Sequence, residues 1–135
     1  MNRTLATLNQ DLIKAAEDVC KKAYAPYSHY FVGAAVLTDS GEIYTGCNVE
    51  NASFGLTVCA ERHAIANAVS KEGATPKIQA IAVVAAKGET CTPCGACRQV
   101  IAEFGHNIQV IYKDGGQWKD SPISAFLPGS FDFKN

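Results

Sequence analysis

The sequence predicts an α/β fold, in which a mixed five-stranded sheet lies between helices in three layers, α/β/α. Two observations predict it. After an opening pair of strand-like runs, helical and strand-like stretches alternate along the chain, which is typical of α/β domains. The run over residues 78–86 contains no charged residue, as is expected of a strand with both faces buried.

The first element is predicted to be a helix. Apolar residues recur three or four positions apart from Leu8 to Ala23, which is the spacing of one helix face. Thr7 is expected to cap this helix, with Gln10 completing a capping box, and Pro26 is expected to stop it.

The later elements follow from short apolar runs and the turn-forming residues between them. Asp39, Ser40 and Gly41 form a turn between two strands, and Gly73 and Gly105 close two helices. The predicted elements are, in order, strand 31–37, strand 42–47, irregular segment 48–56, helix 60–71, strand 78–86, loop 87–93, helix 94–104, strand 108–112, a short returning strand 117–119 and helix 123–127.

Length and composition limit the class of protein. The chain has 135 residues, 47% of them hydrophobic and 19% charged, which predicts one globular domain over residues 1–135. No apolar run approaches the roughly 18 residues of a membrane helix, so no membrane partner is expected. The first ten residues lack the apolar centre of a signal peptide, which places the protein in the cytoplasm.

The charge balance bears on the substrate. Twelve basic and thirteen acidic residues give a formal net charge of −1, and no basic stripe is present. Binding to a nucleic acid backbone needs such a stripe, so no nucleic acid partner is expected. A small, weakly charged substrate fits this composition better.

Cysteines mark the candidate metal site. Cys59 starts one predicted helix, and Cys94 and Cys97 lie three residues apart at the start of another. A helix N-terminus favours thiolate, and side chains three apart share one face of the helix. If the two helices start side by side, the three thiolates converge on one ion, and zinc is the expected metal.

The residues beside Cys59 predict a catalytic site. Three protein ligands leave the fourth tetrahedral position of zinc open to water, as in catalytic zinc sites. Zinc lowers the pKa of such a water, and Glu61 is close enough along the chain to accept its proton. Arg62 is expected to donate hydrogen bonds to the thiolates and offset their charge.

Other readings of these residues remain open. Buried cysteines with no metal, or a zinc that only stabilises a binding module, need neither Glu61 nor an open coordination position. Cys91 extends the spacing to Cys91-x-x-Cys94-x-x-Cys97, which also occurs in iron–sulfur proteins, but a fourth cysteine soon afterwards is missing. We therefore interpret Cys91 as a bystander.

Several segments together resemble the short, single-domain cytidine deaminases, and zinc-dependent base deaminases use the same ligand pattern. The resemblance covers nearly the whole chain, in the family's order. The segments are 27–29 (Tyr-Ser-His), 32–35 (Val-Gly-Ala-Ala), 46–52 (Gly-Cys-Asn-Val-Glu-Asn-Ala), 59–62 (Cys-Ala-Glu-Arg), 93–99 (Pro-Cys-Gly-Ala-Cys-Arg-Gln) and 127–131 (Leu-Pro-Gly-Ser-Phe).

The resemblance implies a cytidine-deaminase-like fold and roles for further residues. Asn48 and Glu50 would hydrogen-bond the ribose, and Ala60 would line the substrate site. An aromatic ring would stack on the pyrimidine. The family usually has Phe at Tyr30, and the adjacent Phe31 leaves open which of the two rings stacks.

The resemblance also implies the assembly and the reaction. Short members of the family are homotetramers with shared active sites, in which Phe131 would close a neighbouring subunit's site. The expected reaction is zinc-dependent hydrolysis of cytidine and 2′-deoxycytidine to uridine and 2′-deoxyuridine plus ammonia, in pyrimidine salvage. A modified cytidine or an aminonucleoside antibiotic is the alternative substrate, and a non-catalytic zinc module is the alternative of another class.

Overall fold

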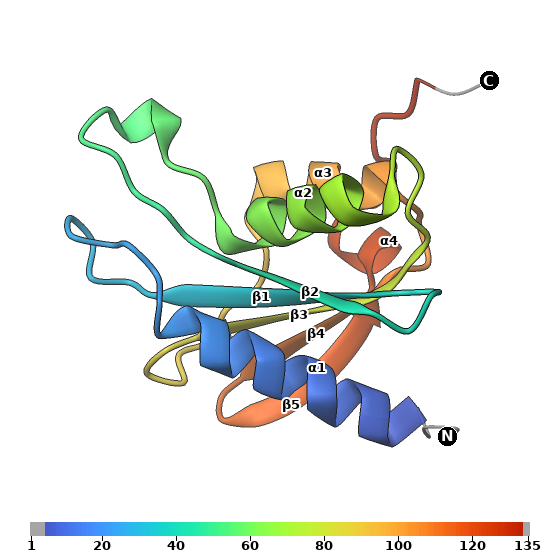
Figure 1. Ribbon diagram of the computed structural model, residues 1–135, viewed down its shortest axis with the longest axis horizontal. Helices are drawn as coiled ribbons and strands as arrows, with labels where there is room; N and C mark the ends of the chain where they lie inside the picture. The colour runs from blue at the N-terminus through green and yellow to red at the C-terminus, as the bar shows by residue number, and fades with distance from the viewer. Residues whose placement is uncertain (1–4, 134–135) are drawn as a thin grey trace.

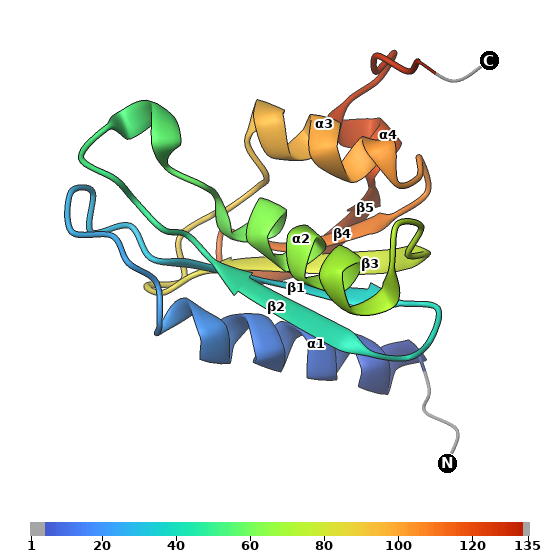
Figure 2. The ribbon, with the colours of Figure 1, turned by 45° about the horizontal axis from the view of Figure 1, so that its top comes forward.

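The computed structural model describes residues 5–133, and it has the predicted three layers (Figure 1). One face of a five-stranded sheet carries α1, and the other face carries α2, α3 and α4 (Figure 2). The elements are α1 (Leu5–Cys20), β1 (Val32–Thr38), β2 (Ile43–Cys47), the 3-10 helix η1 (Phe54–Leu56), α2 (Ala60–Glu72), β3 (Ile78–Ala85), α3 (Gly95–Glu103), β4 (Gln109–Asp114), β5 (Gln117–Pro122) and α4 (Ile123–Phe126).

The sheet is mixed, as the sequence predicts. Its strand order is β2-β1-β3-β4-β5. β1 pairs antiparallel with both β2 and β3, β3 pairs parallel with β4, and β4 pairs antiparallel with β5. The parallel pair needs a crossover, which α3 supplies on the same face as α2.

The ends of α1 differ from the prediction. The chain is already helical at Leu5, so Thr7 lies inside the helix and is not its cap. The helix ends at Cys20, several residues before Pro26, because Tyr24 leaves the helix to form a β-bridge with Val49. Apolar spacing alone did not reveal this pairing, since its partner lies far away in the sequence.

β5 is longer than the predicted strand 117–119. It pairs with β4 in unbroken register from Asp114 opposite Gln117 to Gln109 opposite Pro122. β5 is rich in polar residues, so the pattern of hydrophobic residues does not predict its full length. β5 is an edge strand of the sheet and its residues are exposed or half-buried, so polar side chains are tolerated there.

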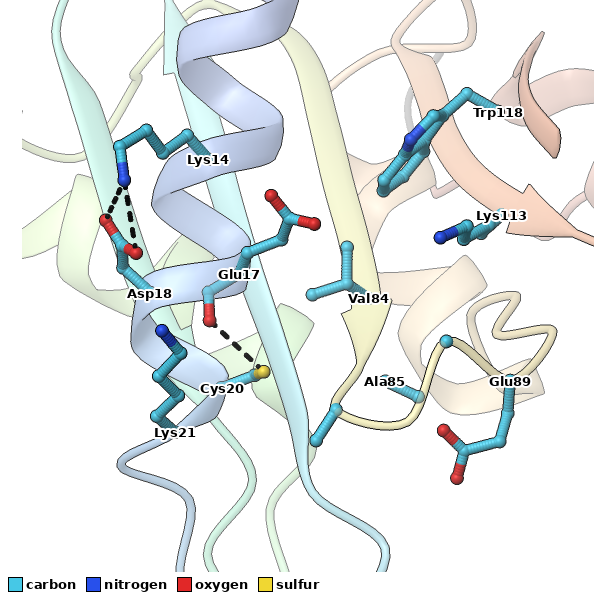
Figure 3. A pocket seen from close by; sticks show the side chains of 12 residues that line it. Lys14, Glu17, Asp18, Cys20, Lys21, Val84, Ala85, Glu89, Lys113 and Trp118 are labelled. Carbon is cyan, nitrogen blue, oxygen red and sulfur yellow. Dashed lines mark hydrogen bonds and ion pairs between the residues drawn. The ribbon is translucent and has the colours of Figure 1, made fainter. Parts of the chain in front are cut away.

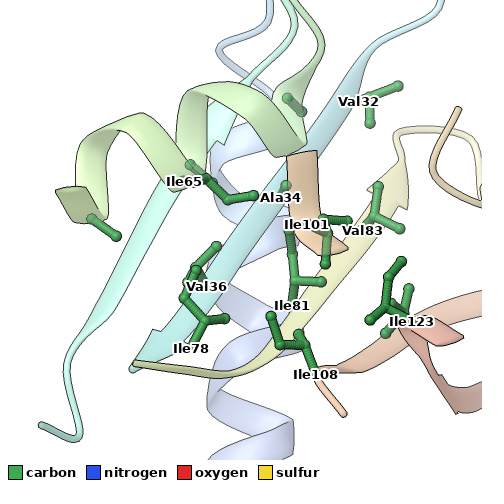
Figure 4. Close-up of a cluster of buried hydrophobic side chains, with 14 of the residues drawn as sticks. Val32, Ala34, Val36, Ile65, Ile78, Ile81, Val83, Ile101, Ile108 and Ile123 are labelled. Atoms are coloured by element: carbon green, nitrogen blue, oxygen red, sulfur yellow. The ribbon is translucent and has the colours of Figure 1, made fainter. Parts of the chain in front are cut away.

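The core has two parts, one on each face of the sheet. Leu12 and Ala16 of α1, both fully buried, pack on one face together with Ala35 and Leu37 of β1. The other part lies under α2 and α3 and is shown in Figure 4. Its labelled members are Val32, Ala34, Val36, Ile65, Ile78, Ile81, Val83, Ile101, Ile108 and Ile123.

Two glycines allow the helices to approach the sheet closely. A Cβ at Gly33 would lie 2.2 Å from the carbonyl oxygen of Ala16 in α1. A Cβ at Gly46 would lie 2.4 Å from the backbone nitrogen of Ala64 in α2. Both distances are shorter than real Cβ contacts, so only glycine fits at either position. Gly46 thus allows α2 to pack closely against β2 and sets the distance between them. The candidate site lies at the start of α2.

None of the helices that the structure describes is both long enough and apolar enough to cross a bilayer.

Candidate metal centre and adjoining cavity

Two helices begin at cysteines and place their sulfur atoms together. Cys59 is the N-cap of α2, and Cys94 is the N-cap of α3. The sulfur atoms of Cys59, Cys94 and Cys97 all lie within 4.8 Å of one another. The positive ends of both helix dipoles face these sulfurs, which favours their thiolate forms.

The cluster fits zinc in its spacing and its chemistry. Zinc–sulfur bonds of about 2.3 Å in a tetrahedron put two sulfurs about 3.8 Å apart. The Sγ atoms of Cys59 and Cys94 lie 3.8 Å apart. Within residues 5–133 no further His, Cys, Asp or Glu joins these three ligands, and Cys91 is outside the group, as predicted. The residues present thus leave one tetrahedral position free of protein.

Cationic and thiol donors stabilise charge on the cluster. A terminal nitrogen of Arg62 donates to Cys59 Sγ at 3.5 Å. Hydrogen bonds from Cys97 and then from Arg62 lower the pKa of Cys59 well below the ordinary value of a thiol. The backbone N–H of Cys97 donates to Cys94 Sγ at 3.4 Å. The predicted contact of Arg62 with a thiolate is therefore present.

Glu61 lies in the first turn of α2, buried beside the cysteines. Only 4% of its surface is exposed. Burial raises the pKa of this carboxyl to about 7, while a hydrogen bond with Cys97 opposes the shift. A carboxyl that changes protonation near neutral pH is suited to move protons in either direction.

A cavity of about 160 Å³ opens beside the cluster. Among the residues that sequence reasoning assigned to substrate, Tyr30, Asn48 and Ala60 line it. Phe31 is not among the lining residues, so Tyr30 is the ring that faces this space. The full lining is Tyr30, Val32, Asn48, Thr57, Cys59, Ala60, Glu61, Cys91, Thr92 and Cys94.

Asn48 is buried, and its side-chain amide forms hydrogen bonds with two backbone groups. Its Oδ1 accepts from the Val32 N–H, and its Nδ2 donates to the Tyr30 carbonyl, both at 2.8 Å. The amide retains one N–H and one lone pair for another partner.

Glu50 lies outside this cavity. Its carboxylate accepts from the backbone N–H groups of Tyr27 and Ser28 at 2.9 and 3.1 Å, and from the Ser28 hydroxyl. It lines a neighbouring hollow of about 390 Å³, and Thr57 lines both spaces. The hydrogen bond from Ser28 is the main cause that lowers the pKa of Glu50.

Phe131 also lies outside the cavity of its own chain. Its ring is 72% exposed and contacts Phe133, with ring centroids 6.3 Å apart. Its carbonyl oxygen accepts from Gln99 of α3 at 3.1 Å. Phe131 is therefore presented on the surface near the end of the described chain.

A larger hollow lies on the opposite side of the sheet, next to α1 (Figure 3). It measures about 420 Å³ and is lined mostly by charged residues and by Trp118. Lys14 pairs there with Asp18 at 3.3 Å, and Lys113 lies 5.6 Å from the centre of the Trp118 ring. The smaller cavity is lined by Cys59 and Cys94 of the three-cysteine cluster and by the buried Glu61, which makes it the candidate active site.

Sequence reasoning missed Arg98, which shapes the loop ahead of Cys94. Its guanidinium donates to the carbonyl oxygens of Pro93 at 2.7 Å and Phe126 at 3.0 Å, and it lies 5.1 Å from the centre of the Phe126 ring. Arg98 directly follows Cys97, and this position in the sequence indicates that it lies near the metal cluster. Its partner Phe126 on α4 is 28 residues away, so the contact between them could not be predicted.

Comparison with known proteins identifies the family. Residues 6–113 match the family described as "Cytidine and deoxycytidylate deaminase zinc-binding region". The chain belongs to this family. Its membership agrees with the three-cysteine cluster, and zinc is the cofactor that both indicate.

Individual relatives match over most of their length. Cytidine deaminases of Sporosarcina psychrophila and Halalkalibacterium halodurans are 42% and 46% identical over 124 residues, covering 90% of this chain and 90% and 92% of theirs. The crystal structure of cytidine deaminase from Burkholderia pseudomallei superposes with a TM-score of 0.82 at 43% identity, covering 90% of this chain and 98% of that one. The similarity therefore extends over 90% of this chain.

Proposed function

We propose that this protein hydrolyses cytidine and 2′-deoxycytidine to uridine and 2′-deoxyuridine, releasing ammonia, in pyrimidine salvage. One observation carries the proposal: a buried glutamate, Glu61, lies against a cluster of three cysteines at a cavity. Relatives that match this chain over most of their length are named cytidine deaminases.

The chemistry needs a water nucleophile and a group that moves protons. Cys59, Cys94 and Cys97 would hold zinc, which would supply the nucleophile by lowering the pKa of a bound water molecule. Glu61 accepts a proton from the attacking water and delivers it to N3 of the ring, while the water oxygen bonds to C4. Glu61 then takes the remaining proton from the new C4 hydroxyl and gives it to the amino group, so that the C4 carbonyl forms as the C4–N bond breaks and ammonia leaves.

The remaining site residues orient the nucleoside. Tyr30 stacks on the pyrimidine, and Ala60 borders it in the cavity. The Asn48 amide hydrogen-bonds the ribose through the N–H and lone pair that its backbone contacts leave free, and the Glu50 carboxylate accepts from a ribose hydroxyl. Arg62 offsets the charge of the thiolates. Holding the base over Glu61 in this way lowers the entropic part of the barrier.

The position of Phe131 supports a proposal about the assembly. We propose a cytoplasmic homotetramer of single-domain chains, residues 1–135, in which Phe131 of one subunit closes the cavity of a neighbour. Its support is that the Phe131 ring is 72% exposed and lies outside its own chain's cavity. A small nucleoside is the only partner besides other copies of the chain.

The test compares the wild-type protein with Glu61→Gln, which keeps the size of the side chain but removes its proton transfer. Glu42→Gln, an exposed carboxylate in the turn between β1 and β2, is the matched control. Zinc per chain and the ultraviolet absorbance of cytidine are measured on the same samples. We expect zinc near one per chain in all three proteins and turnover in the wild type and Glu42→Gln alone.

Other outcomes separate the parts of the proposal. Full turnover by Glu61→Gln would overturn the role of Glu61. Zinc in the wild type without turnover of cytidine or deoxycytidine would overturn the substrate assignment and direct attention to a modified cytidine or an aminonucleoside antibiotic. Zinc bound by four protein ligands, with no turnover of cytidine, deoxycytidine or their modified forms, would favour the non-catalytic module.

A further inference from the structure

Glu50 is held by the turn that precedes β1. Its Oε1 accepts from the backbone N–H groups of Tyr27 and Ser28 at 2.9 and 3.1 Å. Its Oε2 accepts from the Ser28 hydroxyl. Each carboxylate oxygen offers about two lone pairs, so Oε1 is fully used and Oε2 keeps one lone pair. A ribose hydroxyl that donates to Glu50 would therefore bind the same oxygen that Ser28 holds.

The direction of the Ser28 hydroxyl is set by a second contact. Ser28 Oγ accepts from the Tyr30 N–H at 3.0 Å, and its own hydrogen is directed to Glu50. The bond to Tyr30 spans His29, whose φ of 56° lies in the left-handed region that residues with a side chain adopt rarely. One hydroxyl thus connects this turn of the backbone to the second oxygen of Glu50.

Tyr30 is also held by contacts that do not involve Ser28. Its carbonyl oxygen accepts from Asn48 Nδ2 at 2.8 Å. The carbonyl oxygen of the next residue, Phe31, accepts from the Ala86 N–H at 2.9 Å. Loss of the Ser28 hydroxyl would leave both contacts in place, so its main effect would fall on the Glu50 carboxylate.

That carboxylate needs two fixed points to hold its plane. The two N–H groups on Oε1 fix one oxygen and leave the other free to rotate about it. The Ser28 hydroxyl on Oε2 supplies the second point. It therefore sets the direction in which the free lone pair of Oε2 points.

This carboxylate borders a hollow that adjoins the cavity of the metal centre. Ser28, Glu50 and Thr57 are among the residues that line the hollow, and Thr57 also lines the cavity that contains Glu61. A nucleoside whose pyrimidine occupies the cavity can therefore extend its ribose toward the hollow. The free lone pair of Glu50 Oε2 is the acceptor that the turn offers there.

We propose that Ser28 is a positioning residue, whose hydroxyl orients the Glu50 carboxylate toward a ribose hydroxyl of the substrate. This inference rests on the proposed function. It assigns Ser28 to the binding of the sugar and not to the reaction at the base, because the three cysteines and Glu61 lie at the starts of α2 and α3.

Two other roles for Ser28 give different results. A purely structural residue would lower Tm when it is replaced and would affect every substrate alike. A direct ligand of the sugar would contribute independently of Glu50. A positioning residue has an effect only when both Glu50 and a ribose hydroxyl are present.

The experiment uses the zinc-loaded protein with two substrates. They are cytidine and 2′,3′-dideoxycytidine, which lacks the ring hydroxyls of the ribose. The variants are Ser28→Ala, Ser28→Thr, Glu50→Ala and Ser28→Ala combined with Glu50→Ala. KM, kcat, zinc content and Tm are measured for each, and where dideoxycytidine is not turned over, its inhibition constant against cytidine replaces KM.

Ser40→Ala is the matched control. Ser40 Oγ also donates to a carboxylate, that of Glu72 at 2.7 Å, and also accepts from an N–H two residues later, that of Glu42 at 3.4 Å. Glu72 is the last residue of α2, whereas Glu61 lies in its first turn. The control therefore removes the same pair of contacts away from the substrate.

We expect Ser28→Ala to raise KM for cytidine about three- to tenfold, the effect of one lost hydrogen bond, with kcat changed less. Ser28→Thr keeps the hydroxyl and should keep KM near that of the wild type. Ser28→Ala should leave KM nearly unchanged with dideoxycytidine, and likewise in the Glu50→Ala background. Ser40→Ala should lower Tm at most and leave KM unchanged.

Three results would overturn the inference while leaving the proposed function intact. One is a Ser28→Ala variant with wild-type KM for cytidine. Another is an equal loss with cytidine and dideoxycytidine, which indicates a structural role. The third is an unchanged Ser28→Ala effect in the Glu50→Ala background, which indicates direct contact with the sugar. If Glu50→Ala is inactive, the comparison of the two substrates decides. A zinc-loaded wild type that does not convert cytidine contradicts the proposed function and, with it, this inference.

Discussion

Replacing Gly46 by alanine tests how the fold positions the candidate site. The added Cβ would lie 2.4 Å from the Ala64 nitrogen and 2.7 Å from the Ala60 carbonyl oxygen. Ordinary contact begins near 3.4 Å, so α2 must move away from β2 by about 1 Å. Both contacts are backbone atoms of one helix, so rotation of a side chain cannot relieve them. The displaced segment includes Ala60 and Glu61, in the first turn of α2.

Two effects are expected from Gly46→Ala. Overpacking of this kind costs about 1–3 kcal/mol, which lowers Tm by about 4 to 11 °C for a domain of this size. A shift of about 1 Å at a catalytic group reduces kcat/KM about a hundredfold. Thermal unfolding at one protein concentration measures the first effect, and cytidine absorbance on zinc-loaded protein measures the second.

Gly55→Ala is the matched control for this experiment. Gly55 belongs to the 3-10 helix η1, and a Cβ there meets nothing within 4 Å. We expect its Tm and kcat/KM to stay near those of the wild type. A Gly46→Ala protein with unchanged Tm and unchanged kcat/KM would refute the argument that α2 is held by backbone contact with β2.

Three further predictions concern the core, the loop ahead of Cys94 and the pH dependence. Leu12→Ala empties a fully buried position under α1 and should cost about 2–5 kcal/mol in chemical denaturation, with zinc content unchanged. Arg98→Lys loses the paired contacts with two carbonyls and should cost about 1–3 kcal/mol and weaken zinc binding in a chelator competition. Hydrogen bonds from Ser40, then Thr38 and Tyr44, lower the pKa of Glu72 below its ordinary value of 4.5. Its stabilising contribution is therefore complete above pH 4.5 and is lost as the pH falls below that value, so Glu72→Gln should show a smaller loss of Tm on acidification than the wild type.

The elements of the fold were predictable where one local signal was enough. Apolar runs such as the one through Ile81 and Val83 predicted the buried strands, and the turn at Gly41 predicted the hairpin. The end of α1 and the length of β5 were not predictable, because both depend on pairing between distant residues. Tyr24 bridges to Val49, and Gln117–Pro122 acquires its strand character from β4.

The same distinction applies to the candidate site. Features set by local spacing were predictable, and contacts between distant residues were not. The three cysteines, Glu61 and the contact of Arg62 with Cys59 followed from spacing at two helix starts. What Glu50 binds did not follow, because its partners Tyr27 and Ser28 are more than 20 residues away in the sequence.

The cap of α2 links the metal to the thermodynamics of the whole chain. Helices usually begin with a side chain that satisfies a free amide of the first turn, but Cys59 makes no such bond. Its sulfur is instead directed to the cluster with Cys94, 35 residues along the chain. A ligand that binds the folded helix starts and not the unfolded chain stabilises by mass action, by about 1.4 kcal/mol for each tenfold excess over its dissociation constant. The folded fraction of this protein is thus a function of free zinc, and its melting temperature reports the concentration of the metal around it.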